Sequence, residues 1–248
     1  RSPDEIEARF AALGCDVSLM GASGTEEQLP HDVDVLLAAV DETLESSVRT
    51  GHPLFQNQLF AGADPISIGG ELLISATNTN VHTYEVAPVF TLVEQAVTEK
   101  VAALAGWRAG ADGLFTPGGS ISNMYGMQLA RAAADPDFLT RGASGGKRLV
   151  GFVSDDSHYS YAKAARLLGI GSDNLVRVAT EDATGKMDLA ALDEAVRAVE
   201  RDANALSFFV GSTAGTTVRG AFDDLGEISA LCARSPSPLW HHVDASWG

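Results

Sequence analysis

Side chains that could bind a ligand follow three short apolar runs in the second half of the sequence. The runs, each with the residue that follows it, are 149–153 with His158, 206–210 with Thr213, and 239–243 with Asp244. If these runs are parallel strands, their carboxyl ends meet at one edge of a sheet, where ligands bind in open α/β folds. An imidazole, a hydroxyl and a carboxylate would then line one pocket. Each residue alone is also typical of a helix cap or a turn, and that alternative stays open.

A second candidate site is the segment Gly118-Gly119-Ser120. Two glycines allow the backbone to approach a ligand closely, and a helix that begins there would direct free N–H groups towards an anion. The Ser120 hydroxyl would add one more donor. The segment therefore fits a phosphate-binding turn, although a glycine turn followed by a serine cap explains the local sequence equally well.

The elements that would position these residues alternate between strand and helix. Short apolar runs at 149–153, 175–178, 206–210 and 239–243 are separated by helical patterns that begin near residues 158, 189 and 225. Such alternation predicts right-handed crossovers and a mostly parallel sheet flanked by helices, which is an α/β fold. The sequence contains no GxGxxG segment, so the dinucleotide-binding version of this fold is not favoured.

The first half of the chain has a different pattern. Apolar residues predict helices from about residue 32 to the Gly51-His52-Pro53 stop, from about 87 to 107, and from 118 to about 134. Residues 1–30 lack a clear period and are interpreted as an arm or loop, and 54–83 show few strong periods. We therefore expect an N-terminal arm and helix over 1–50 and a large ligand-binding domain over 51–248, incomplete at its C-terminal end.

Composition narrows the functional class. The net charge is −16, with 33 acidic and 17 basic residues, which disfavours binding to nucleic acid or to anionic membranes. No apolar run has the length of a membrane span, and Cys15 and Cys232 lack partners at metal-binding spacing, so we expect no metal site. The beginning of the chain is not typical of a signal peptide, and the default location is the cytoplasm. The absent initiator Met suggests part of a longer polypeptide.

Six segments, in this order, resemble the group II pyridoxal-phosphate-dependent amino-acid decarboxylases. They are His52–Phe60, Asn78–Asn80 with Thr83–Phe90, Pro117–Tyr125, Ser157–Ser160, Thr213–Thr217 and His242–Gly248. Within the family they are most similar to glutamate decarboxylase and cysteine-sulfinate decarboxylase. The resemblance implies pyridoxal 5'-phosphate as the cofactor and the large-domain fold of the aspartate-aminotransferase-like enzymes. It also implies a homodimer, because members of the family share their active sites between two subunits.

The resemblance assigns a role to each candidate in the pocket. Asp244 would hold the pyridine nitrogen of the cofactor protonated, so that the ring can accept the electron pair released with CO2. His158 would stack on the ring and assist proton transfer, with a structural or capping histidine as the alternative. Gly119 and Ser120 would bind the phosphate, and Thr213 would contact the cofactor. Ser246 stands where the family usually has Ala against the ring, and its hydroxyl could add a hydrogen bond.

The resemblance also implies an acidic amino-acid substrate: aspartate, glutamate or cysteine sulfinate. Gln58 matches a loop on the substrate side of the acidic-substrate enzymes, and Asn80 matches a further position in the pocket. Amides there could donate hydrogen bonds to a carboxylate or sulfinate. The alternative for both is a loop amide that satisfies backbone groups.

One expected feature is missing from the sequence. The family carries its Schiff-base lysine in a Pro-His-Lys segment beyond the Asp-Ala-(Ala/Ser)-Trp-Gly motif, but the four lysines here, Lys100, Lys147, Lys163 and Lys186, lie in no such segment. Three explanations stay open. The chain is a fragment of a longer enzyme, it pairs in a heteromer with a second polypeptide that carries the lysine, or it is a lysine-less regulatory or structural half-subunit. A changed reaction, such as oxidative decarboxylation or transamination, is a further alternative.

Overall fold

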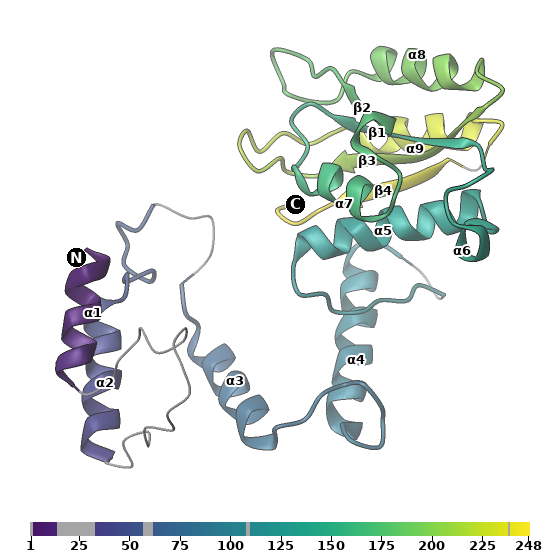
Figure 1. Ribbon diagram of the computed structural model, residues 1–248. Helices are drawn as coiled ribbons and strands as arrows, with labels where there is room; N and C mark the ends of the chain where they lie inside the picture. Colours follow the sequence, from purple (N-terminus) through teal and green to yellow (C-terminus); the bar gives the residue numbers. More distant parts are fainter. Residues whose placement is uncertain (1, 14–32, 57–61, 108–109, 238) are drawn as a thin grey trace. The chain divides into compact units, whose positions relative to one another are not determined.

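A computed structural model describes residues 2–13, 33–56, 62–107, 110–237 and 239–248 of the chain (Figure 1). The chain divides into two compact units, Arg1–Leu92 and Val93–Gly248, each held together by contacts within itself. This division falls inside one long helix, whereas the sequence suggested a boundary near residue 50.

The first unit is helical in its described residues. It contains α1 (Pro3–Ala12), α2 (Val33–Ser46), α3 (Pro65–Thr77) and the beginning of α4 (Pro88–Leu104). Residues 1–30 were interpreted as an arm or loop, and this interpretation is wrong for Pro3–Ala12, which form helix α1. Ser2 and Glu5 form a capping box, in which the Ser2 hydroxyl accepts from the Glu5 N–H and the Glu5 carboxylate accepts from the Ser2 N–H.

Helix α3 was not predicted from the sequence either. Its start is well marked, since the Asp64 carboxylate accepts a hydrogen bond from the Ser67 N–H at 2.9 Å and Pro65 is the first helical residue. The two adjacent glycines inside the helix, Gly69 and Gly70, lower its intrinsic propensity and hide the pattern. Most of its large apolar side chains are exposed within the unit.

The second unit contains the α/β fold. After the end of α4 it runs through α5 (Gly119–Ala134), α6 (Phe138–Arg141), β1 (Arg148–Ser154), α7 (Ser160–Leu167), a 3-10 turn (Ser172–Asn174), β2 (Leu175–Val178), α8 (Leu189–Glu200), β3 (Ala205–Thr213), α9 (Leu225–Arg234) and β4 (Trp240–Asp244). The predicted strands and the helices that follow them are thus present within a few residues of the expected bounds.

The four strands form one parallel sheet in the order β2-β1-β3-β4. In the pairing of β3 with β4, Thr213 lies directly opposite Asp244. A register shift next to Val150 leaves Phe208 as an extra residue of β3, so Phe208 and Phe209 both pack in the same apolar cluster. The predicted parallel α/β fold is confirmed.

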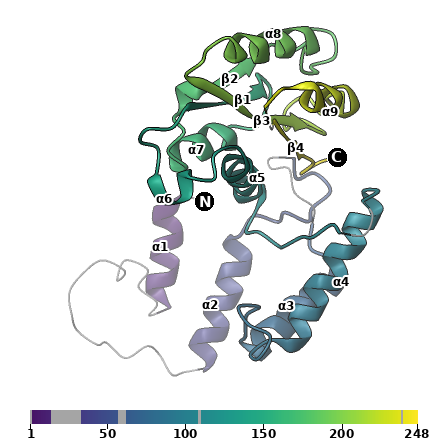
Figure 2. The same ribbon diagram turned by 90° about the vertical axis from the view of Figure 1, so that its right-hand side faces the viewer.

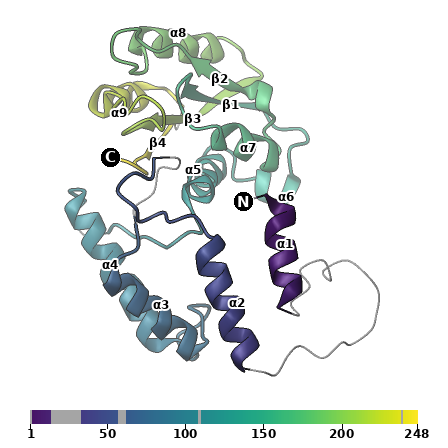
Figure 3. The same ribbon diagram turned by 90° about the vertical axis from the view of Figure 1, so that its left-hand side faces the viewer.

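Helices cover both faces of the sheet, as Figures 2 and 3 show from opposite sides. On one face, sheet residues such as Phe152 and Val210 pack against α8 and α9 through Leu192, Val196 and Ile228. On the other face, Val153 and Phe209 pack against α5 and α7 through Met127, Tyr161 and Ala165. Burial of these side chains is the main favourable term that fixes the carboxyl edge of the sheet.

Neither a membrane span nor a metal cluster is present in the described residues. No helix among them is both long and apolar enough to cross a membrane. No group of three or more His, Cys, Asp or Glu side chains within the same residues could hold a metal ion.

Helix α5 lies so close to β4 that a side chain at Gly126 would collide with the His242 ring. A Cβ atom added there would lie 2.3 Å from Nδ1 of His242. We predict that Gly126→Ala lowers the free energy of unfolding by about 1–3 kcal/mol through overpacking, although alanine favours helix. Urea denaturation followed by circular dichroism measures the change.

The matched control is Gly226→Ala in α9. A Cβ atom there meets only a carboxylate oxygen of Asp224 at 3.9 Å, so the change should be neutral or stabilising by up to about 1 kcal/mol. A Gly126→Ala protein as stable as the Gly226→Ala protein would contradict the close approach of α5 and β4.

Candidate functional site

The three strand ends singled out in the sequence meet at the carboxyl edge of the sheet. Asp244 ends β4 and is buried, Thr213 ends β3 opposite it, and His158 follows the end of β1 at Ser154. The parallel arrangement of the strands brings these residues to one edge.

The carboxylate of Asp244 accepts three hydrogen bonds. Its Oδ2 accepts from Nδ2 of Asn123 at 2.8 Å, and its Oδ1 accepts from the backbone N–H of Ser246 at 3.1 Å and from the Ser246 hydroxyl at 2.7 Å. Burial by itself raises the pKa of Asp244, but the donors from Asn123 and Ser246 together outweigh burial and hold the pKa below its ordinary value. The site therefore contains a buried, ionised carboxylate at neutral pH.

Asn123, on α5, connects this carboxylate to two histidines. Its Nδ2 also donates to Oγ of Ser160 at 3.0 Å, and Oγ of Ser160 lies 2.8 Å from Nδ1 of His158. The backbone N–H of Ser160 donates to the same Nδ1 at 3.2 Å. On the other side, Oδ1 of Asn123 lies 2.8 Å from Nε2 of His242. A hydrogen-bonded network thus extends from Asp244 to His158.

A second buried carboxylate, Asp223, lies beside Thr213. Its Oδ2 accepts from the Thr213 N–H and its Oδ1 accepts from the Met187 N–H, both at 2.7 Å. Burial raises the pKa of Asp223 and exceeds the effect of these two hydrogen bonds. Oγ1 of Thr213 is buried without a hydrogen-bond partner among the described residues, so this hydroxyl has capacity for a partner that those residues do not supply.

The glycine turn begins α5 next to Asp244. Gly118 has φ 132°, a conformation that favours glycine, and no side chain caps the N-terminus of this 16-residue helix. A Cβ atom at Gly119 would lie 2.8 Å from Oγ of Ser246, so only glycine leaves this space open. Ser120 follows in the first helical turn and is exposed. An anion placed here would meet uncapped N–H groups and the positive end of the helix dipole.

The two predicted substrate contacts belong to the first half of the sequence. Gln58 is outside the described residues. Asn80 belongs to the first unit and is exposed, and its Oδ1 accepts the N–H of His82 at 2.9 Å. This hydrogen bond corresponds to the loop-amide alternative and involves the oxygen of Asn80.

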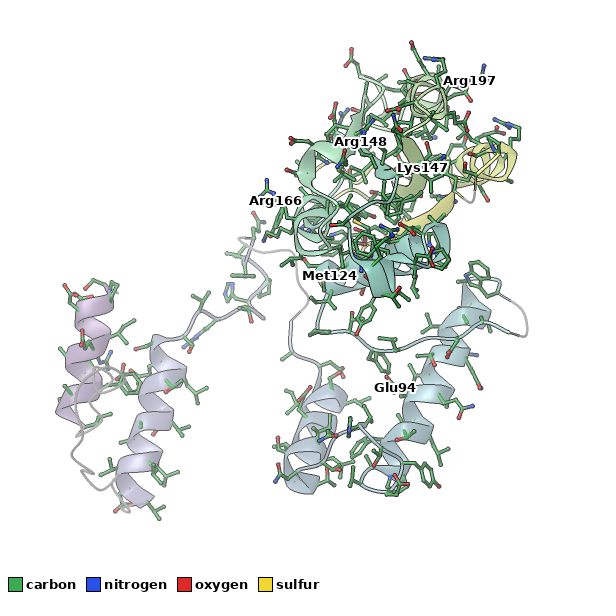
Figure 4. All side chains as sticks on the ribbon, turned by 45° about the vertical axis from the view of Figure 1, so that its right-hand side comes forward. Glu94, Met124, Lys147, Arg148, Arg166 and Arg197 are labelled. Atoms are coloured by element: carbon green, nitrogen blue, oxygen red, sulfur yellow. The ribbon has the colours of Figure 1, made fainter. Side chains whose placement is uncertain are left out.

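The lysines occupy other positions. Lys147 lies beside Arg148 at the start of β1, the end of the strand opposite the site (Figure 4). Nζ of Lys163 lies 4.4 Å from the centre of the Tyr159 ring, Lys100 is on α4, and Lys186 precedes α8. Within the described residues, no lysine side chain is hydrogen-bonded to the Asp244 network.

The pyridoxal-dependent decarboxylase conserved domain matches residues 21–248. The chain belongs to the pyridoxal-dependent decarboxylase family. It is 45% identical over 219 residues to an acidic amino acid decarboxylase of Xenopus tropicalis, covering 88% of this chain and 42% of that protein. It is 43% identical over 248 residues to the cysteine sulfinic acid decarboxylase of Mus musculus, covering 100% and 47%.

Solved structures agree with this assignment. The crystal structure of mouse CSAD matches with a TM-score of 0.87 and 40% identity, covering 100% of this chain and 48% of that one. The glutamate decarboxylase domain of a Vibrio parahaemolyticus protein matches with a TM-score of 0.85 and 26% identity, covering 100% and 52%. The resemblance stated from the sequence is confirmed, and the chain spans about half the length, or less, of the curated relatives named above.

Sequence reasoning missed several polar residues of this decarboxylase-family site. Asn123, Ser160 and His242 all stand inside the motif segments, but no role was given to them. For Asn123 the sequence did offer a signal, because this amide lies in the second turn of the helix that begins at the glycine turn. The structure shows that its side chain is buried. Its partners Asp244 and Ser160 are 121 and 37 residues away in the chain, so the contacts required the fold.

The two adjacent histidines of β4 generate a pH prediction. Burial lowers the pKa of both His241 and His242 below 6.5, and for His242 nearby Asp244 opposes this only in part. Between the lowered pKa and 6.5 the unfolded chain binds more protons than the folded one, so stability should fall as the pH drops through this interval. We expect the protein to be less stable to urea at pH 5.5 than at pH 7.5.

Replacement of one histidine isolates its share of this effect. His242→Gln removes one of the two groups, so this variant should lose less stability than the unmodified protein between the same two pH values. Titrating groups that do not interact with His242 contribute equally to both proteins and cancel in the comparison. Equal losses in the two proteins would show that His242 is not held neutral by burial.

Proposed function

We propose that this chain supplies the cofactor-binding part of a pyridoxal-phosphate-dependent decarboxylase of an acidic L-amino acid: aspartate, glutamate or cysteine sulfinate. The observation that carries the proposal is the buried carboxylate of Asp244, held ionised by Asn123 and Ser246 next to Thr213 and the glycine turn. An ionised carboxylate at this edge is the group that a protonated pyridine nitrogen requires.

Three features of the chain fit pyridoxal 5'-phosphate. The uncapped turn at Gly119 and Ser120 suits a phosphate, the buried Thr213 hydroxyl lacks a partner among the described residues, and Asp244 suits a cationic ring nitrogen. When bound, this cofactor supplies an electron sink for the pair released as the substrate loses CO2.

The residues of the chain would then divide the work as follows. Asp244 holds a proton on the ring nitrogen, and Gly119 with Ser120 binds the phosphate. His158 and Ser246 would lie against the ring, and His158 would move a proton at the reacting carbon. Burial of the network limits access of water, which strengthens the charge interaction at Asp244.

The substrate class is part of the proposal. The relatives described above are named for acidic amino acids and for cysteine sulfinic acid, and they are 45% and 43% identical to this chain. Gln58 and Asn80 are the proposed donors to the side-chain carboxylate or sulfinate. The NH2 group of Asn80 would take that role, since the hydrogen bond from His82 uses the oxygen of the amide.

We propose that the lysine that binds the cofactor comes from a further segment or from a second subunit. The positions of Lys147, at the amino end of β1, and of Lys163, against Tyr159, support this, because neither is hydrogen-bonded to the Asp244 network in the described residues. A homodimer is also proposed, supported by the exposed apolar side chains of α3 and α4. The cytoplasm is the proposed location, and the buried free thiol of Cys232 fits a reducing compartment.

The substrate proposal is tested by measuring CO2 release in the enzyme that contains this chain, reconstituted with pyridoxal 5'-phosphate. We expect release from at least one of aspartate, glutamate and cysteine sulfinate, and none from asparagine or glutamine, which lack the acidic side chain. No CO2 from any amino acid would refute the decarboxylase proposal, and release from the amides alone would refute the acidic-substrate assignment.

The role of Asp244 is tested by Asp244→Ala. This variant should lose at least about 100-fold in kcat, because the ring nitrogen loses its anionic partner, while the circular dichroism spectrum stays unchanged. Asp202→Ala is the matched control: Asp202 forms an exposed ion pair with Arg148 at the opposite end of the sheet and should keep full activity. An active Asp244→Ala enzyme would refute the assigned role.

A further inference from the structure

The network around Asn123 fixes which atoms donate and which accept. The Asp244 carboxylate is ionised and can only accept hydrogen bonds, so the Asn123 atom 2.8 Å from it must be the NH2 group. The second hydrogen of that NH2 group is donated to Oγ of Ser160. The oxygen of Asn123 consequently faces Nε2 of His242 and accepts a hydrogen bond from it.

The hydrogen bonds around His158 fix which of its ring nitrogens carries the proton. Ser160 is buried, so its hydroxyl hydrogen needs a partner inside the protein, and Nδ1 of His158 at 2.8 Å is the acceptor available to it. The backbone N–H of Ser160 donates to this same nitrogen at 3.2 Å. Nδ1 therefore accepts two hydrogen bonds and carries no hydrogen, and the proton of the neutral imidazole lies on Nε2.

We propose that Asn123 and Ser160 are positioning residues that connect Asp244 to His158 and hold the His158 proton on Nε2. The structural part of this inference concerns the chain alone, whereas its importance for the reaction rests on the function proposed above. Through two intervening side chains, the carboxylate that holds the ring nitrogen protonated also fixes which nitrogen of His158 can deliver a proton. One hydrogen-bonded network thus orients both Asp244, the partner of the ring nitrogen, and His158, the proposed proton donor.

The chain contains a built-in comparison for this inference. His241, next to His242 on β4, has a different side-chain partner, since its Nε2 lies 2.7 Å from Oγ of Ser212, a hydroxyl that also donates to the carbonyl oxygen of His242 at 3.4 Å. Three histidines therefore have three different hydroxyl or amide partners: Ser160 for His158, Asn123 for His242 and Ser212 for His241. Removing one partner should affect one histidine and leave the histidines outside its network unchanged.

The test is 15N NMR of the imidazole nitrogens in the full chain without added cofactor. In the unmodified protein, His158 and His242 should each show an unprotonated Nδ1 and a protonated Nε2. In Ser160→Ala, Nδ1 of His158 loses the hydroxyl donor and keeps the backbone N–H of residue 160, so the His158 resonances should move part of the way towards the average of the two tautomers, and His242 should keep its pattern. In Asn123→Ala, His242 should lose its fixed tautomer.

Ser212→Ala is the control for general disturbance of the site: it should change the resonances of His241 and leave those of His158 unchanged. A protonated Nδ1 on His158 in the unmodified protein would overturn the inference. The inference is also wrong if Ser160→Ala leaves the His158 resonances unchanged, or if Ser212→Ala changes them equally.

The importance for the reaction is tested by steady-state kinetics of the enzyme that contains this chain. Ser160→Ala should lower kcat by about 10- to 100-fold with KM changed less than about threefold, because the hydroxyl orients His158 without touching the substrate. Ser160→Thr restores a hydroxyl and should recover most of kcat. An unchanged kcat in Ser160→Ala would refute the positioning role.

Failure of the wider proposal gives a different result. If the enzyme releases no CO2 from any amino acid while His158 and His242 keep the expected tautomers, the decarboxylase function is wrong and the network stands. If CO2 is released but the tautomers differ from those expected, the function stands and the network is wrong. Urea denaturation of each variant verifies that it is folded, and Asn123→Ala gives an independent test if Ser160→Ala does not fold.

Discussion

The buried charge of Asp244 is the constraint on which the rest of the site depends. A carboxylate taken out of water without donors costs several kcal/mol, and such a group normally takes up a proton instead. Here Asn123 and two donors of Ser246 surround it and keep its pKa low. These donors come from α5 and from the residues that follow β4, so the helix and the strand must dock in one register for the charge to be stable.

The close docking of α5 on β4 follows from this requirement. Gly126 allows the helix to lie against the His242 ring, and Gly119 leaves room for the Ser246 hydroxyl. Both glycines lie on α5 and flank Asn123 in sequence. A larger side chain at either position would separate the Asn123 amide from the Asp244 carboxylate. The close packing of α5 is therefore needed to keep the buried charge hydrogen-bonded.

The sequence predicted the scaffold better than the network. Alternating apolar runs were sufficient to place all four strands, and parallel pairing then brought His158, Thr213 and Asp244 to one edge. Helices α1 and α3 were missed because one is short and the other contains Gly69-Gly70, so neither shows a strong apolar period. Judged from its neighbours in the sequence alone, Asn123 is an ordinary amide on a helix, and Ser160 is an ordinary serine at the start of a helix. Their importance depends on partners that are distant in the chain, and those partners become visible only in the fold.

Ser246 can now be interpreted through the donors and acceptors at Asp244. The resemblance described from the sequence implies Ala at this position, and the Ser246 hydroxyl donates to Oδ1 of Asp244 at 2.7 Å in addition to its backbone N–H. A carboxylate has about four acceptor positions, two on each oxygen. Ser246 occupies both on Oδ1, and Asn123 occupies one on Oδ2. Among the described residues, one position remains on Oδ2, which is what a single N–H donor from a ring nitrogen would need. The serine therefore adds a donor that favours the ionised carboxylate without removing the acceptor that the proposed chemistry requires.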